Sequence, residues 1–393
     1  MKRVLSISTL YPNAHAPRFG TFVARSLEAL AARGDWEVTM INPIGIPAIA
    51  FGQYRELSAV AVDGEEGGVH VHRPRFSLIP RIGARLNPAF IARAALPLAK
   101  RLHAERPFDL VDAQFFFPDG PAAARIARAL GLPLSIKARG SDITFWCRKD
   151  WALGQICEAA AEADGLLAVS KALARDMASF GLPRDKITIH HTGLDRSRFC
   201  LRDRTAARAE LADTLGIALP GGAPLISTIG GLVPHKGQSL AIRALAQIPH
   251  AHLAIAGTGP EREALGALAR RLKLRDRVHF LGSVDHDVMP LLLSASQAMV
   301  LPSEREGLAN AWVEALACGT PVVIPDIGGA REVVTGPDAG RIAPREPEAI
   351  AAAIRELLAS PPDPQAVATH AARFSWKENA AQLAEYYERL VRS

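Results

Sequence analysis

The stretch of sequence that decides the fold is SEREGLANAWVEALACGTPVV, residues 303–323. An apolar run, residues 298–301, leads into this stretch, and a second apolar run, residues 321–324, ends it. Between them we expect a helix over residues 311–318, because the segment has helical length and no internal proline. A strand–helix–strand unit of this kind predicts parallel pairing and therefore an α/β sheet.

The same alternation extends along most of the 393 residues, which is the length of two ordinary domains. A charged and then Pro/Gly-rich stretch, residues 195–224, interrupts it as an inter-domain linker would. We therefore expect two doubly wound, Rossmann-like domains that face a cleft at the carboxyl ends of their strands. The expected domains are residues 1–200 and 201–375, followed by a C-terminal helix over residues 376–393.

One pair of strands is expected to break the parallel pattern. Residues 57–62 and 69–73 are rich in β-branched and other strand-forming residues, and they flank an acidic, Gly-rich turn at residues 63–68. This arrangement predicts a hairpin-like pair.

Composition excludes several classes of protein. Apolar residues make up 49% of the chain and charged residues 22%, which excludes a mainly disordered protein. The four cysteines are far apart and form no Cys-x-x-Cys pair, so we expect neither a disulfide framework nor a zinc site. No apolar stretch approaches eighteen residues, so we expect no transmembrane helix and a cytoplasmic protein.

The net charge of +6 is concentrated in the first half. Residues 1–200 carry 26 Lys and Arg against 19 Asp and Glu, whereas residues 201–393 carry 20 against 21. Within residues 73–106 the only acid is Glu105, and eight residues are basic: Arg73, Arg75, Arg81, Arg85, Arg93, Lys100, Arg101 and Arg106. No nucleic-acid recognition motif accompanies this charge, so nucleic acid is not an expected partner.

The basic segment contains a possible helix with an apolar stripe, and this stripe has two interpretations. It either packs into the protein core or, with the apolar residues of the preceding loop, lies on an anionic membrane surface. The stripe consists of Phe90, Ile91, Ala94, Leu98 and Leu102, and the loop residues are Phe76, Leu78 and Ile79.

Two carboxylates, Glu306 and Glu314, are the first candidates for chemistry. Seven residues separate them, which would be about 12 Å along a continuous helix. Gly307 indicates instead that Glu306 lies in the loop and Glu314 in the helix. So placed, the two carboxylates can bind hydroxyls at both ends of an extended polyol, while the amides of residues 307–310 suit an anion. The alternative is an ordinary helix start, with Glu306 favouring the helix dipole and Glu314 solvated.

The segment from Glu306 to Val323 resembles the family 4 glycosyltransferases, whose signature is E-x7-E followed by E-A-x-A-x-G-x-P-V-V. The resemblance extends over nearly the whole chain. Residues 114–120 are similar to the family's H-x-x-x-P-D-G, 139–142 to H-G-x-D, 191–199 to N-G-V-D…F, and 230–237 to G-R-L…K-G. Residues 11–23, with Phe19 and Gly20, resemble the family's first-strand loop.

This resemblance implies the GT-B arrangement, with the acceptor bound mainly by the first domain and the nucleotide-sugar donor by the second. It implies that Glu306 contacts the donor sugar, Glu314 the ribose and Lys236 the diphosphate, and that Phe19 and Gly20 form an acceptor or phosphate loop. It also implies that the C-terminal helix packs on the first domain. The other donor-binding residues that it implies are Gly231, Leu232, Leu281, Gly307, Leu308, Ala309 and Asn310.

Two residues depart from the family pattern. Gly231 stands where the family has Arg in G-R-L, so one cation for the diphosphate is missing from its usual place. Arg139 stands where the family has His in H-G-x-D. We expect Arg139, together with Asp142, to contribute to catalysis by binding phosphate or acceptor, since Arg can bind phosphate through two nitrogens. The alternative is a structural ion pair between Arg139 and Asp142.

No metal or other cofactor is expected. Residues 285–287, Asp-His-Asp, form a possible metal motif, but they precede a predicted helix and helix capping is the better interpretation. His70 and His72 share one face of a predicted strand, and two ligands are too few for a site.

The expected function is that of a retaining, metal-independent glycosyltransferase. It would move a hexosyl unit from a nucleotide-sugar to a cell-surface glycan or glycolipid precursor, as a cytoplasmic protein that can associate with the inner membrane face. Two alternatives remain open: a nucleotide-sugar epimerase on the same fold, and a non-catalytic nucleotide-sugar-binding partner.

Overall fold

The computed structural model describes residues 1–17, 19–47, 53–59, 61–79 and 83–392. The chain divides into two compact units, Met1–Gly193 with Trp376–Ser393, and Leu194–Ser375. The first residues of the expected linker belong to the second unit because their side chains pack there. Arg198 forms an ion pair with Asp287 at 3.0 Å, and the ring of Phe199 lies 5.0 Å from that of His286.

The first unit is built on an eight-stranded sheet of order β10-β9-β8-β7-β1-β2-β5-β4. All neighbours are parallel except β4 and β5. Its central strands are buried and mostly apolar, as strands covered on both faces must be, whereas the edge strand β4 is Gly-Glu-Glu and mostly exposed. They are β1 (Lys2–Ile7), β2 (Trp36–Ile41), β4 (Gly64–Glu66), β5 (Val69–His72), β7 (Leu110–Ala113), β8 (Leu134–Ala138), β9 (Gly165–Ala168) and β10 (Ile187–Ile189); β3 (Ile44–Ile46) and β6 (Arg75–Ser77) form a separate parallel pair.

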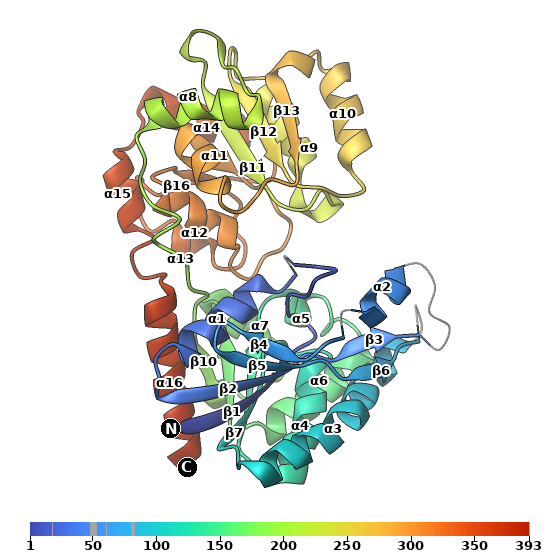
Figure 1. Ribbon diagram of the computed structural model, residues 1–393. Helices are drawn as coiled ribbons and strands as arrows, with labels where there is room; N and C mark the ends of the chain where they lie inside the picture. Colours follow the sequence, from blue (N-terminus) through green and yellow to red (C-terminus); the bar gives the residue numbers. More distant parts are fainter. Residues whose placement is uncertain (18, 48–52, 60, 80–82, 393) are drawn as a thin grey trace. The chain divides into compact units, whose positions relative to one another are not determined.

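Helices cover both faces of this sheet (Figure 1). The helices of the first unit are α1 (Thr21–Ala31), α2 (Gln53–Ala59), α3 (Asn87–Glu105), α4 (Asp119–Leu130), α5 (Ser141–Thr144), α6 (Asp150–Glu162), α7 (Lys171–Ser179) and α16 (Trp376–Arg392), of which α2 lies beside β3. The C-terminal helix α16 lies beside α1 (Figure 1). Asn379 accepts a hydrogen bond from Ser26 at 2.8 Å, and Tyr387 meets Trp36 edge-on at 5.5 Å, so α16 is part of the core of this unit.

The predicted strand over residues 57–62 is wrong. Residues 57–59 end helix α2, and Val60 lies outside the described residues. The hairpin does exist, but its first strand is β4, within the segment that was predicted to be the turn. A two-residue turn, Gly67 at φ 57° and Gly68 at φ 79°, reverses the chain between β4 and β5.

The basic segment at residues 73–106 is tied into the fold. On α3, Ile91, Ala95 and Ala99 are buried, and Phe90 and Ile91 belong to a cluster that includes Phe76. The structure therefore favours core packing of the apolar stripe. Arg73 is buried in an ion pair with Glu66, Arg106 pairs with Glu37, and Arg81 lies outside the described residues.

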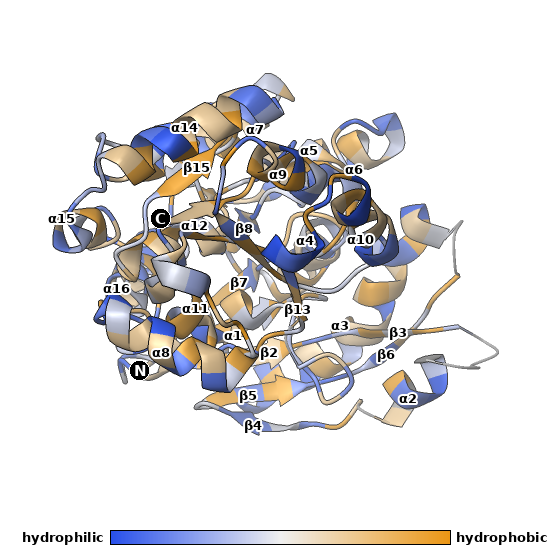
Figure 2. Ribbon diagram, turned by 90° about the horizontal axis from the view of Figure 1, so that it is seen from above, coloured by the Kyte–Doolittle hydropathy of each residue, from blue (hydrophilic) through white to orange (hydrophobic). Residues whose placement is uncertain are grey.

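The second unit contains a fully parallel sheet of order β13-β12-β11-β14-β15-β16. Helix α14 carries one apolar and one polar face, as Figure 2 shows, whereas every residue of α11 is buried. The strands are β11 (Leu225–Ile229), β12 (His252–Ala256), β13 (Val278–Gly282), β14 (Ala298–Val300), β15 (Val322–Ile324) and β16 (Gly340–Ile342). The helices are α8 (Arg204–Leu215), α9 (Gln238–Leu245), α10 (Arg262–Arg271), α11 (Met289–Ala295), α12 (Asn310–Ala317), α13 (Ala330–Val333), α14 (Pro347–Ala359) and α15 (Pro364–Thr369).

The strand order places a switch point in each sheet. In the second unit the chain goes from β11 to β12 on one side and later returns to β14 on the other side of β11. In the first unit β1 has β2 on one side and β7 on the other. Loops diverge where the strand order reverses, and open α/β sheets bind their ligands there, beyond the carboxyl ends of the strands.

Candidate active site

In the second unit, Lys236 and Glu306 meet at the switch point. Lys236 ends a short 3₁₀ turn, Pro234–Lys236, in the loop after β11, and Glu306 lies in the loop after β14. Lys236 Nζ is 2.5 Å from Glu306 Oε1, and both side chains are mostly buried, with 21% and 13% exposed. A cation and a carboxylate are thus held together at the edge of the sheet where a ligand is expected.

Backbone contacts between the two loops hold this pair in place. The Glu304 amide donates to the His235 carbonyl at 2.7 Å. A Cβ on Gly237 would lie 2.3 Å from the Pro302 carbonyl oxygen, and Gly237 has a φ of 73°. The loops approach so closely that only glycine fits at this position. The position of the ion pair is therefore set by the backbone and not only by the two side chains.

Helix α12 begins at Asn310, four positions after Glu306, and presents its amino terminus to the same edge of the sheet. Its N-cap is Ala309, which supplies no side-chain hydrogen bond to the first amides. Gly307, Leu308 and Ala309 are buried, and the Gly307 carbonyl accepts the Gly329 amide at 2.7 Å. Helix α12 thus begins with amides that no side chain caps, as a helix that binds an anion does.

Glu314 lies on the second turn of α12, as the loop-then-helix prediction required. Burial raises the pKa of this carboxyl to about 7. No described residue supplies a side chain that hydrogen-bonds to it. A partly buried carboxyl without a partner in the protein is suited to bind the hydroxyls of a ligand.

The remaining predicted donor-binding residues lie on neighbouring loops. Gly231 and Leu232 follow β11; the Gly231 carbonyl accepts from the Gln238 side chain at 3.0 Å, and the buried Leu232 donates to Thr258 at 2.9 Å. Asn310 is the first residue of α12. Leu281 lies near the end of β13, and the Gly282 carbonyl that follows it accepts the Gly257 amide at 2.7 Å.

In the first unit, Arg139 follows β8 near that unit's own switch point. Its guanidinium donates through Nε to the Gln114 carbonyl at 2.9 Å and through Nη2 to the Gln114 side chain. It lies 4.9 Å above the ring of Phe22. Its buried Nη1 has no partner among the described residues. Burial lowers the pKa of Arg139 to about 10, so it remains charged at neutral pH with one donor unused.

Asp142 does not form the ion pair that was the alternative role of Arg139. Its carboxylate accepts backbone amides of Phe116 at 2.9 Å, Gly140 at 2.7 Å and Arg139 at 3.0 Å. Burial raises the pKa of this carboxyl in spite of these bonds. Asp142 therefore orients the loop that carries Arg139, and the Arg139 side chain is directed to Gln114.

The predicted acceptor loop lies at the start of α1. Gly20 is the N-cap of α1 with a φ of 72°, and a Cβ there would lie 2.5 Å from the backbone of Leu10. Phe19 is 51% exposed. Since Phe22 follows on α1 and packs under Arg139, this loop and Arg139 belong to one region of the first unit.

Sequence reasoning missed the buried polar residues around Arg139. Asp112 accepts from Ser6 at 2.9 Å and from Gln114 at 2.5 Å. Lys137 Nζ lies 2.7 Å from His190 Nδ1, and burial lowers the pKa of Lys137 well below its usual value. A polar residue in an otherwise apolar strand could have indicated such a network, because burial of a polar group without a partner is costly.

No group of three metal-ligating side chains occurs among the described residues. Asp285 forms a local turn before α11, in which its side chain accepts the Asp287 amide at 2.9 Å. The capping interpretation is wrong in detail, because the N-cap of α11 is Val288 and no side chain caps this helix. His72 pairs with Asp63 at 2.7 Å. Within the described residues, none of the helices is long and apolar enough to span a membrane.

Comparisons with known proteins agree with this geometry. The family described as "Glycosyltransferase Family 4" matches residues 20–198, and "Glycosyl transferases group 1" matches residues 216–383. The chain belongs to the GT-B glycosyltransferases. The first match covers every strand but β1 of the sheet that carries Arg139, and the second covers the sheet that carries Lys236 and Glu306.

Individual curated proteins match only part of this glycosyltransferase. A D-inositol 3-phosphate glycosyltransferase of Mycolicibacterium gilvum is 33% identical over 215 residues, which are 52% of this chain and 47% of that protein. The chain thus spans about half the length of the curated relatives it matches.

Two solved structures share the fold. A sucrose-phosphate synthase from Thermosynechococcus elongatus has a TM-score of 0.78 at 20% identity, with 99% of both chains covered. HepE of Anabaena in complex with UDP has a TM-score of 0.75 at 21% identity, with 99% of this chain and 100% of that chain covered. HepE has also been solved with UDP-glucose.

Proposed function

We propose that this glycosyltransferase moves a hexosyl unit from a nucleoside-diphosphate sugar to a hydroxyl of a cell-surface glycan or glycolipid precursor, with retention of anomeric configuration and without a metal. The observation that supports this most is the Lys236–Glu306 ion pair at the switch point of the second sheet. It combines a cation for a diphosphate with a carboxylate for sugar hydroxyls.

In this proposal the second unit binds the donor. Lys236 and the first amides of α12 contact the diphosphate, Glu306 the sugar hydroxyls and Glu314 the ribose. UDP-glucose is the donor to test first, because HepE binds it on the same fold. Negative charge grows on the diphosphate as the glycosidic bond breaks. A cation and helix amides already held in place stabilise that charge without reorganising.

The ion pair of Glu306 with Lys236 supports retention of the anomeric configuration. A carboxylate paired with Lys236 at 2.5 Å is a poor nucleophile and a poor base, because its charge is already compensated. In the proposed reaction the leaving phosphate oxygen takes the proton of the acceptor hydroxyl on the same face of the sugar. The protein then orients the two substrates and stabilises the leaving group.

The first unit is proposed to bind an anionic acceptor. Arg139 is a buried cation with an unused Nη1 donor, held by Gln114 and stacked on Phe22. Arginine recognises phosphate and carboxylate oxygens through such donors. The curated relative in Mycolicibacterium gilvum is named for a phosphorylated acceptor, inositol 3-phosphate.

A thermal-shift screen followed by a turnover assay tests this function. UDP-, GDP- and ADP-sugars are screened first, because a ligand that binds only the native state raises Tm. We expect UDP-glucose to raise Tm and to be consumed only when a phosphorylated acceptor is added. NMR of the product should show the anomeric configuration of the donor. An inverted product would exclude retention.

The same assay separates the two other functions. Conversion or hydrolysis of the donor without any acceptor would indicate an epimerase. Donor binding without turnover under every acceptor would indicate a non-catalytic binding partner.

A further inference from the structure

Four aromatic side chains of the first unit form one cluster, and three of them reach its surface. The ring centres of Trp146 and Trp151 lie 5.7 Å apart, and Phe145 meets Trp146 edge-on at 5.1 Å. Phe117 is buried and lies 4.8 Å from Trp146. Both tryptophans are half-buried, and Phe145 is 41% exposed. Partly exposed rings that adjoin one another form an apolar patch, and such patches mark binding sites more often than chance placement does.

This aromatic cluster belongs to the two loops that hold Arg139. Phe117 lies in the loop after β7, and Trp146 lies in the segment after β8 that begins with Arg139. The two loops are joined twice, by the hydrogen bond from Arg139 to the Gln114 carbonyl at 2.9 Å and by the contact of Phe117 with Trp146. Since β7 and β8 are neighbours, the cluster lies at the carboxyl edge of the sheet, where open α/β sheets bind ligands.

Exposed aromatic side chains are concentrated at this edge. Among the phenylalanine, tyrosine and tryptophan residues that the structure describes, Phe19 and Phe145 are the two that are exposed. Phe19 lies between β1 and α1, and β1 is the other neighbour of β7. Both exposed rings therefore follow the carboxyl ends of strands in the middle of one sheet, and packing of the core does not account for them.

Hydrogen-bond donors accompany the rings. The ammonium of Lys149 lies over the ring of Phe145, 4.8 Å from its centre. In the described part of the chain neither the indole N–H of Trp146 nor that of Trp151 donates to a protein acceptor, and neither is shut off from solvent. A purely apolar partner would cover these donors without pairing them, which is costly. The cluster is therefore suited to a ligand that carries both apolar and hydroxyl groups.

We infer that this cluster binds a pyranose ring of the acceptor, so that the acceptor is a saccharide. The C–H groups on one face of a sugar ring carry partial positive charge and are attracted to the negative face of an aromatic ring. The hydroxyls at the edge of the sugar accept hydrogen bonds from Lys149 and from the indole N–H groups. Arg139, in the neighbouring loop, is left for the anionic group of the same acceptor. The inference rests on the proposed function, since it specifies the acceptor of that reaction.

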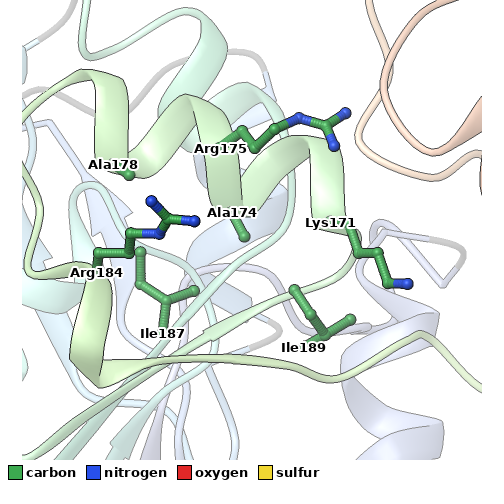
Figure 3. Close-up of a pocket in the computed structure, with 7 residues that line it drawn as sticks. All are labelled: Lys171, Ala174, Arg175, Ala178, Arg184, Ile187 and Ile189. Atoms are coloured by element: carbon green, nitrogen blue, oxygen red, sulfur yellow. The ribbon is translucent and has the colours of Figure 1, made fainter.

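A groove between α7 and β10 offers a different place for a sugar on the first unit (Figure 3). Its volume is about 490 Å³, and its apolar lining consists of Ala174, Ala178, Ile187 and Ile189. None of the side chains that line it is aromatic. A sugar that requires stacking on a ring should not bind there, so this groove supplies one of the controls.

Saturation-transfer difference NMR of the full chain with cellobiose tests the site. All ring hydroxyls of its two β-linked glucose units are equatorial, so the ring faces carry only C–H groups. Irradiation of the aromatic protons of the wild type should transfer saturation to these C–H protons. Titration should show that Phe145→Ala and Trp146→Leu each weaken cellobiose binding at least about 10-fold, the size expected for an aromatic anchor of a binding site.

Two control variants should bind cellobiose as the wild type does. Phe180→Ala removes a half-buried ring that directly follows α7, at the amino edge of the same sheet. Ala178→Leu narrows the groove between α7 and β10. Cooperative thermal unfolding of each variant shows that it is folded, and it does not depend on whether the proposed transfer reaction occurs.

The inference is overturned if the wild type receives no saturation transfer, or if Phe145→Ala and Trp146→Leu bind cellobiose as well as the wild type does. Equal losses in Phe180→Ala or Ala178→Leu would also overturn it, the latter in favour of the groove. Binding to phosphatidylcholine vesicles that is lost in Phe145→Ala, without binding of cellobiose, would indicate a membrane contact instead.

The fate of this inference can be separated from that of the proposed function. Cellobiose binding without any transfer from UDP-glucose to a phosphorylated acceptor would leave the saccharide site in place and contradict the reaction. Transfer to a phosphorylated acceptor without cellobiose binding would contradict the saccharide site alone.

Discussion

The Nζ atom of Lys236 lies 2.5 Å from the Oε1 atom of Glu306, although 70 positions separate the two residues in the chain. One residue follows β11 and the other follows β14, and these strands are neighbours at the switch point of the sheet. The pair is therefore a consequence of strand order. In a donor complex the cation has two possible anionic partners, Glu306 and the diphosphate, which makes it sensitive to substitution.

Replacing Lys236 by Ala should lower kcat by about 10²–10³-fold, the usual effect of removing one charge-stabilising group from an active site. The free energy of unfolding should fall by only about 1–2 kcal/mol, between the values of exposed and buried ion pairs. Steady-state kinetics and urea unfolding measure the two effects. Lys236→Arg, which keeps the charge, is the control; unchanged turnover in Lys236→Ala would refute the diphosphate role.

The effects of Glu306→Gln and Lys236→Ala on kcat/KM should not be additive. Residues in direct contact have coupling energies of about 0.5–3 kcal/mol. We expect the double variant to be only slightly less active than the worse single variant. A double-mutant cycle on kcat/KM measures this coupling. Strict additivity would show that the two side chains act on the reaction separately.

Donor affinity should rise with pH because of Glu314. Burial raises the pKa of this carboxyl to about 7, and its ionised form accepts hydrogen bonds from ribose hydroxyls better than its neutral form. UDP-glucose is a suitable probe because it has no phosphate proton that titrates near pH 7. Titration calorimetry should show tighter binding at pH 8 than at pH 6 in the wild type. In Glu314→Gln the affinity for UDP-glucose should not depend on pH in this way.

The same group predicts the pH dependence of stability. Because the folded-state pKa is raised, the native protein holds this proton between the unfolded value near 4.5 and about 7. The contribution of Glu314 to stability is therefore greatest below that window and decreases as the pH rises through it. Glu314→Gln should remove this decrease in urea unfolding between pH 5 and pH 8. An unchanged profile would show that Glu314 is ionised in the native state.

Gln114 should act through Arg139. The Asp112 carboxylate holds the Gln114 amide, and Gln114 oxygens in turn accept two guanidinium donors. Arg139→Ala should lower kcat/KM for a phosphorylated acceptor by more than 10-fold, and a change within a few-fold would contradict its role. Gln114→Ala should raise the acceptor KM more than it lowers kcat, and Gln114→Glu should not recover the loss, because a carboxylate at this position cannot donate to Asp112. The double variant should resemble Arg139→Ala.

Gly257→Ala should disturb the loops that carry the donor site. Gly257 has a φ of 150°, and a Cβ would lie 2.0 Å from the Gly230 carbonyl oxygen. We expect the free energy of unfolding to fall by about 2–3 kcal/mol, from backbone strain and the clash. Gly216→Ala is the matched control in the same unit: its φ is 66°, and nothing lies within 4 Å of the added Cβ. It should cost about 1 kcal/mol.

Much of the fold was predictable because its central strands are apolar runs, even where they have only three residues, as β14 and β15 do. The two sheets and the placement of Glu306 in a loop and Glu314 on a helix followed from apolar runs and one glycine. The short elements β16 and α13 were not predicted, because β16 is Gly-Arg-Ile and α13 is Ala-Arg-Glu-Val, and neither is an apolar run.

The residues of the candidate site could be proposed from the sequence, but the contacts between them could not. Sequence spacing could not show that Asp142 binds backbone amides while Arg139 turns to Gln114. That choice depends on the path of the loop after β8. Nor could an amphipathic pattern decide between core and membrane for α3, because both environments accept the same apolar stripe.

The most direct test of the donor site is calorimetric titration of UDP into the wild-type protein and into Lys236→Ala. If Lys236 binds the diphosphate of the donor, UDP should bind the wild type and bind the variant at least about 10-fold more weakly, since a charge-assisted contact contributes about 1.5–3 kcal/mol. Equal Kd values for the two proteins would contradict the central claim that the Lys236–Glu306 pair marks the nucleotide-sugar site.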